Sequence, residues 1–119
     1  MTILLVEDET FTRLMLVAEL EAHGHTVVEA ADADQAISVL RDNSSVRLVF
    51  TDIKIPGTMD GLDLARLVRA EYPSLKVIIA SAHVGLSDWA AEADAAFEKP
   101  YELERVVLKV DQLAGARVQ

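Results

Sequence analysis

The sequence contains no cysteine and few of several other residue types: three prolines, five glycines and 5% aromatic residues among 119. Without cysteine, a disulfide scaffold, a thiol nucleophile and any thiolate metal site are excluded. Basic residues are also scarce, 11 against 20 acidic ones, so a net charge of −9 argues against nucleic acid or an anionic membrane as partner. No apolar run approaches the ~20 residues of a membrane span, and the N-terminus lacks a basic signal region. We therefore expect a cytoplasmic protein.

The hydrophobic share of 51% is too high for a disordered chain. A chain of this length buries roughly 65% of its unfolded surface on folding, which is enough for a core without staples. We expect one domain over residues 1–119 and no second, effector domain.

Short apolar runs alternate with patterns of helical period along the whole chain. The runs predict strands at 3–6, 26–30, 48–51, 77–80 and 95–97, and the helical patterns fall at 10–22, 33–40, 61–72, around 87–93 and from 103 onward. Strands that are apolar throughout are typical of a sheet covered on both faces. The alternation predicts an α/β fold built from right-handed βαβ units around a parallel sheet.

Residues that begin and end helices support these boundaries. Thr10 is placed to cap the first helix, and Gly24 to end it. Asp32 and Gln35 have the spacing of a capping box, and Asp60 can cap the helix that follows the third strand.

Chemically capable residues follow four of the five predicted strands. Glu7 and Asp8 follow the first strand, Asp52 the third, Ser81 the fourth and Lys99 the fifth. In open parallel α/β sheets, ligands bind beyond the carboxyl ends of the strands. Each residue taken alone is explained equally well by an ordinary structural role, as a loop acid, a helix cap or a surface charge. Together they predict one site.

Three carboxylates in one site repel one another, by about 4 kcal/mol for two charges 4 Å apart at an effective dielectric of 20. Protons or a cation must relieve this repulsion. Oxygen ligands favour a hard cation, Mg²⁺ or else Mn²⁺ or Ca²⁺, and Mg²⁺ often shares its site with phosphate oxygens. Lys99 could pair with that phosphate, and a carboxylate beside it could form an aspartyl phosphate.

The segments ILLVEDE, TDIKIPGTMDG, IIASAH and FEKPY, in this order, resemble the receiver domain of two-component response regulators. The resemblance covers the whole chain. It implies a flavodoxin-like, doubly wound (βα)5 fold with strand order 2-1-3-4-5. It also implies a phosphoacceptor signalling domain rather than an enzyme.

The resemblance assigns a role to each residue of the site. Asp52 would accept the phosphoryl group, and Ser81 and Lys99 would contact its oxygens. Asp8, Asp52 and the backbone carbonyl of Lys54 would bind Mg²⁺ directly, with Glu7 acting mainly through water. The Lys99–Pro100 bond is expected to be cis.

Partners and regulation follow from the same resemblance. A sensor histidine kinase or a histidine phosphotransfer protein would donate the phosphoryl group, and an unknown downstream protein would bind the product. Lys54 and His83 occupy positions that would set the dephosphorylation rate. We expect a monomer or a weak dimer, with no nucleic acid or membrane as partner.

The chain departs from the family pattern in three places. Ala96, followed by Phe97, stands where a tyrosine or phenylalanine is usual, so the usual hydroxyl–aromatic coupling is missing. The interval from Ser81 to Lys99 is about one helical turn shorter than usual, which predicts a shortened or irregular fourth helix within 82–94. The loop 56–61 has one extra residue and is expected to bulge.

Three other functions remain open. A phosphorylation-independent adaptor could use the same fold, with the short fourth-helix region as its docking surface. A phosphatase with an aspartyl nucleophile is disfavoured, because Lys54 stands where a second acid is normal. A flavin-binding flavodoxin is disfavoured as well, because Glu7, Asp8 and Glu9 occupy the place of a phosphate-binding loop.

Overall fold

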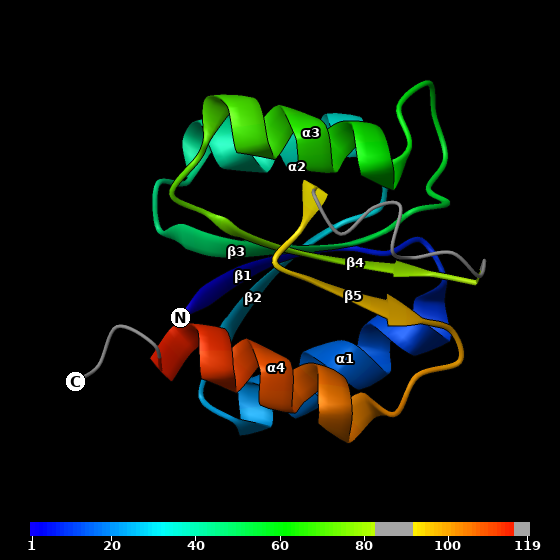
Figure 1. Cartoon of the computed structure of the whole chain (residues 1–119), viewed down its shortest axis with the longest axis vertical. Helices are drawn as coiled ribbons and strands as arrows, with labels where there is room; N and C mark the ends of the chain where they lie inside the picture. The colour runs from blue at the N-terminus through cyan, green and yellow to red at the C-terminus, as the bar shows by residue number, and fades with distance from the viewer. Residues whose placement is uncertain (83–91, 116–119) are drawn as a thin grey trace.

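Five parallel strands form one sheet in the order β2-β1-β3-β4-β5 (Figure 1). The computed structural model describes residues 1–82 and 92–115. The strands are β1 (Thr2–Val6), β2 (Thr26–Ala30), β3 (Val46–Asp52), β4 (Lys76–Ser81) and β5 (Ala95–Glu98). The flavodoxin-like topology and strand order expected from the sequence are confirmed.

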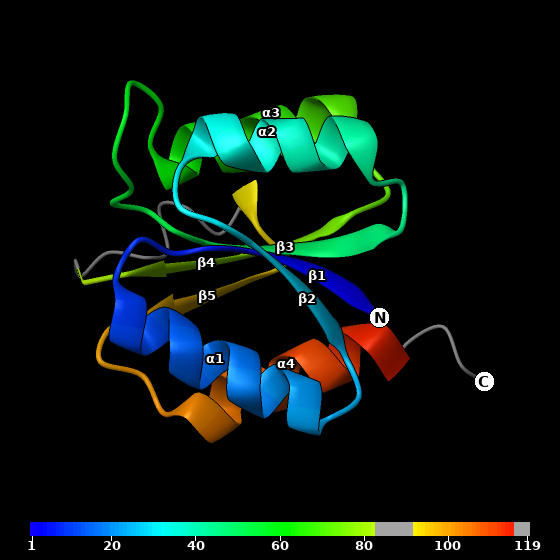
Figure 2. The same cartoon turned by 180° about the vertical axis from the view of Figure 1, so that it is seen from behind.

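Within residues 1–82 and 92–115, two helices cover each face of the sheet. The pair α1 (Thr10–Ala22) and α4 (Leu103–Gly115) lies on one face, and α2 (Ala33–Asp42) with α3 (Gly61–Glu71) lies on the other (Figures 1 and 2). The shortened helix that we expect between β4 and β5, and His83 with it, fall outside the described residues. Among the residues that are described, no helix combines the length and the apolar character needed to cross a membrane.

The central strand β1 is buried on both sides, as its unbroken apolar run predicts. Ile3 and Leu5 belong to the core that α1 and α4 close, whereas Leu4 and Val6 belong to the core under α2 and α3. All four side chains are 0% exposed. Burying each of them stabilises the fold by roughly 1.5–3 kcal/mol.

Capping side chains mark the starts of three of the four helices that the structure describes, and one of the predicted caps is wrong. The side chain of Glu9, and not Thr10, caps α1, because its carboxylate accepts from the backbone N–H groups of Phe11 and Thr12. Asp32 caps α2 as expected, accepting from the N–H of Gln35 at 2.8 Å. Asp60 caps α3 and forms a full capping box with Asp63.

The start of α3 presses directly against the end of β3. Gly61 donates its N–H to the carbonyl oxygen of Ile53 at 2.8 Å. A Cβ atom at Gly61 would lie 1.9 Å from the backbone oxygen of Asp52. Only glycine fits at this contact, and the helix thereby supports the backbone that carries Asp52.

Candidate functional site

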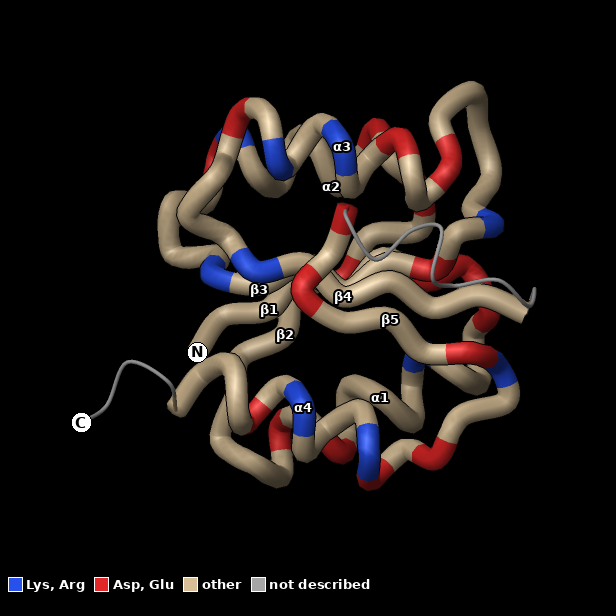
Figure 3. Tube along the Cα trace, viewed as in Figure 1, with Lys and Arg blue, Asp and Glu red and all other residues tan. Residues whose placement is uncertain are grey.

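The strand register brings the predicted site residues to one edge of the sheet. Val6 pairs with Thr51, so Glu7 and Asp52 each follow directly on this pair. Asp52 in turn lies opposite Ala80, one residue before Ser81. Figure 3 shows acidic residues at the carboxyl ends of these strands. Lys99 directly follows Glu98, the last residue of β5.

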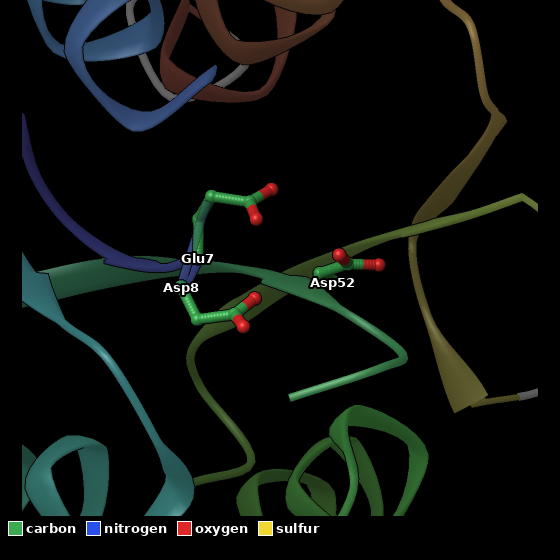
Figure 4. Close-up of side chains that lie close together, drawn as sticks. All are labelled: Glu7, Asp8 and Asp52. Atoms are coloured by element: carbon green, nitrogen blue, oxygen red, sulfur yellow. The ribbon is translucent and has the colours of Figure 1, made fainter. Parts of the chain in front are cut away.

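Glu7, Asp8 and Asp52 form one cluster of carboxylates. One oxygen from each lies within 4.8 Å of the others. Glu7 and Asp8 leave the end of β1 in opposite directions, because successive side chains of an extended chain alternate (Figure 4). Glu7 is 0% exposed and Asp52 7%, whereas Asp8 is open to solvent. The site therefore has a buried floor and an accessible carboxylate at its mouth.

Lys99 joins the two buried carboxylates. Its Nζ lies 2.8 Å from Oδ2 of Asp52 and 3.3 Å from Oε1 of Glu7. The Lys99 N–H also donates to the carbonyl of Ser81 at 2.7 Å, which ties the end of β5 to β4. Burial opposes the charge on Lys99, but the bonds and charges of Asp52 and Glu7 outweigh it and raise the lysine pKa above its ordinary value.

For the Glu7 carboxyl, the effect of burial on the pKa outweighs the effect of its partners. Burial raises the pKa of its carboxyl, although the N–H of Glu9, which donates to Oε2 at 3.0 Å, and the Lys99 ammonium both act to lower it. The net direction is upward because the side chain has no contact with water. The Lys99 ammonium therefore acts against the effect of burial on Glu7.

The remaining predicted residues lie around this centre. Ser81 is buried at the end of β4. Lys54 is exposed in the loop after β3, and the metal-ligand role of its carbonyl stays a prediction. The Lys99–Pro100 peptide is cis, as expected. The loop with the extra residue projects from the body in Figure 1 and contains Gly57 at a φ of +104°.

The departure at β5 is visible in the packing. Ala96 is half-buried against the core under α2 and α3, so no aromatic ring lies at that position. Phe97 packs on the opposite face, with its ring centroid 6.2 Å from that of Tyr101. Both side chains pack, partly buried, against the core closed by α1 and α4.

Two further residues, Arg13 and Tyr101, lie beside the site. Arg13 donates to the backbone carbonyl of Glu7, a contact that ends on the main chain and has no sequence signature. Tyr101 has a buried hydroxyl without a hydrogen-bond partner among the described residues. Burial, the leading cause, raises its pKa to about 12. No local pattern distinguishes this tyrosine from a phenylalanine.

The chain belongs to the response regulator receiver domain family, whose model matches residues 3–111. The receiver domain of two-component systems is therefore the class of protein that this fold and this acidic edge represent.

Individual relatives agree with that assignment. The chain is 33% identical to a cyclic di-GMP phosphodiesterase of Thermotoga maritima, over 99% of this chain and 32% of the relative. It is 32% identical to the two-component response regulator PhoP of Pseudomonas aeruginosa, over 95% of this chain and 51% of PhoP. It thus spans about a third of the first relative's length and about half of the second's.

A solved structure gives the same picture. The response regulator TrrA of Thermotoga maritima, in complex with Mg²⁺–BeF, superimposes with a TM-score of 0.84 at 27% identity. The match covers 94% of this chain and 97% of TrrA.

Proposed function

We propose that this domain accepts a phosphoryl group on Asp52, in a Mg²⁺-dependent reaction, and that the modification changes its affinity for a protein partner. One observation carries the proposal. The Asp52 carboxylate lies among two other carboxylates and is paired with the Lys99 ammonium at 2.8 Å. An aspartate that only caps a helix or lies on the surface is not expected to be clustered with two carboxylates and an ammonium.

The donor set fits a hard divalent cation. Every clustered side chain offers carboxylate oxygen, which Mg²⁺ prefers, and Asp8 is accessible to a hydrated ion. Asp8 and Asp52 would hold the cation directly, together with the Lys54 carbonyl, and Glu7 would act mainly through water. The cation would neutralise charge on the phosphoryl oxygens. The Mg²⁺–BeF complex of TrrA supports this fit, because beryllium fluoride has the shape of a phosphoryl group.

The transfer itself needs only groups at this edge of the sheet. A carboxylate oxygen of Asp52 would form a bond to phosphorus while the phosphorus–nitrogen bond of a phosphohistidine breaks. The electron pair of that bond returns to the imidazole nitrogen of the donor. Lys99 and the Ser81 hydroxyl would then contact the phosphoryl oxygens. Lys54, His83 and Pro100 are expected to modulate the rates.

The donor and the recipient of the signal follow from the family. Receiver domains of two-component systems act with sensor kinases, so a histidine kinase or a histidine phosphotransfer protein is the proposed donor. The recipient is a protein that distinguishes the phosphorylated from the unphosphorylated domain. Since phosphorylation would add charge and strong acceptors beside Lys99, we expect the β5–α4 loop, which carries Lys99, to respond.

Intact-mass measurement after incubation with acetyl phosphate tests the proposal. We expect the wild-type chain to gain the mass of one phosphoryl group when Mg²⁺ is present and none when it is chelated. Asp52→Asn should gain no mass. Asp42→Asn, which removes an exposed carboxylate at the end of α2, should be labelled like the wild type. Labelling of Asp52→Asn at the wild-type rate would refute the assignment.

A further inference from the structure

Arg13 connects three elements beside the acidic edge. From α1, its Nη1 donates to the backbone carbonyl of Glu7 at 2.8 Å, just beyond the end of β1. Its Nε lies 3.0 Å from Oε1 of Glu29 on β2. The Arg13 side chain is 22% exposed and that of Glu29 45%, so the contact to Glu7 is the more protected of the two.

The contact to Glu7 reaches Asp8 through the backbone. The carbonyl of Glu7 and the N–H of Asp8 belong to one planar peptide unit. Fixing the carbonyl oxygen therefore fixes the plane from which the Asp8 side chain departs. The other side of Glu7 is also held, because its N–H donates to the carbonyl of Ala30 at 3.2 Å.

Asp8 depends on this support more than its neighbours do. Glu7 and Asp52 are held by Lys99 through their carboxylates. For Asp8, by contrast, no side-chain hydrogen bond or ion pair is found within the described part of the chain, and the residue is exposed. Its direction is set by its backbone and its own rotamer.

We propose that Arg13 is a positioning residue that holds Asp8 in the orientation required to bind the divalent cation. The proposal rests on the cation site of the proposed function. It assigns Arg13 no contact with the cation or the phosphoryl group. A guanidinium suits the task because its rigid fork serves the Glu7 carbonyl and the Glu29 carboxylate at once, which a lysine ammonium does less well.

A purely structural role for Arg13 makes a different prediction. If the residue merely fastened α1 to β2, its pair with Glu29 would be the important contact, and Glu29→Gln would match the effect of an Arg13 variant. If it positions Asp8, the bond to the Glu7 carbonyl is the important one. Glu29→Gln leaves that bond in place and is therefore the matched control.

Binding of Mn²⁺ to the unphosphorylated chain tests the proposal, with free Mn²⁺ measured by its electron paramagnetic resonance signal. We expect Arg13→Met to weaken Mn²⁺ binding by about tenfold, in the range found for residues that orient metal ligands. Arg13→Lys should recover part of the loss, and Glu29→Gln should bind as the wild type does. Thermal unfolding without metal, measured for each variant, separates affinity from folding.

Each outcome is decisive. Equal Mn²⁺ affinity of Arg13→Met and the wild type would overturn the positioning role while leaving phosphorylation of Asp52 untouched. If Arg13→Met does not fold, wild-type affinity of Arg13→Lys together with a loss in Glu29→Gln would overturn it equally. A wild-type chain that binds no Mn²⁺ would remove the cation site, and with it both this inference and the proposed function.

Discussion

Replacing Asp8 by asparagine should stabilise the fold when no divalent cation is present. The variant removes one of three carboxylates whose oxygens lie within 4.8 Å of one another. Two unit charges at such a separation repel by roughly 1 kcal/mol in water and by roughly 3.5 kcal/mol at an effective dielectric of 20. Because Asp8 is exposed to solvent, the lower figure applies. We expect a gain of about 1 kcal/mol, or roughly 4 °C in the unfolding temperature.

The same substitution should abolish the response to Mg²⁺. A ligand that binds only the folded state stabilises it by RT ln(1 + [L]/Kd), about 1.4 kcal/mol at a concentration ten times the dissociation constant. The wild type should gain this amount, whereas Asp8→Asn should gain nothing. Asp8→Asn, the more stable protein without Mg²⁺, should therefore lose its advantage over the wild type when Mg²⁺ is added.

Thermal unfolding followed by circular dichroism, with and without Mg²⁺, measures both effects. Asp42→Asn removes the same charge from the end of α2 and should keep the wild-type response to Mg²⁺. An Asp8→Asn variant that is less stable than the wild type without Mg²⁺, or that still responds to Mg²⁺ as fully, would refute the electrostatic account of this cluster.

Two further predictions concern the scaffold. Gly61→Ala should lower the free energy of unfolding by about 1–3 kcal/mol, because the alanine Cβ would lie 1.9 Å from the Asp52 carbonyl oxygen. Denaturant unfolding measures this loss, and an unchanged midpoint would contradict the close contact. Asp111 accepts from His23 and His25 at 2.7 Å each. Burial alone would raise the Asp111 pKa, but these bonds hold it below the ordinary 3.8. The stability that the ionised Asp111 contributes to the fold should therefore be complete above pH 3.8 and lost as the pH falls through the pKa of the folded state. Acid unfolding curves of the wild type and Asp111→Asn should accordingly converge at low pH.

The sheet and the acidic edge were predictable because both follow from short-range patterns joined by topology. A strand buried on two faces must be apolar throughout, so the apolar run that begins at Ile3 is enough to predict strand β1. Once the strands are known to be parallel, the residues that follow them must share an edge. Glu7, Asp8 and Asp52 accordingly meet in the structure as the sequence predicts.

The contacts that the sequence did not predict are those that depend on side-chain reach or on distant partners. Thr10 and Glu9 both have oxygens able to cap α1, and only the backbone geometry selects Glu9. His25 and Asp111 are 86 residues apart, and nothing near either one indicates the bond between them. The bond from Arg13 to Glu7 is similar, since it ends on a backbone carbonyl that has no sequence signature.

The charges at this edge of the sheet do not balance. Among the described residues, the Lys99 ammonium pairs with two of the three clustered carboxylates, so the edge keeps an excess of negative charge that a divalent cation matches better than a monovalent one. We infer that phosphorylation then shifts the balance at Lys99, because Asp52 gives up its own charge and the phosphoryl group brings about two negative charges. In the proposed reaction, the Lys99 ammonium would exchange the Asp52 carboxylate for phosphoryl oxygens. Tyr101, two residues further on, contacts the rings of Phe50 and Phe97, so the segment that carries Lys99 is joined to the core closed by α1 and α4.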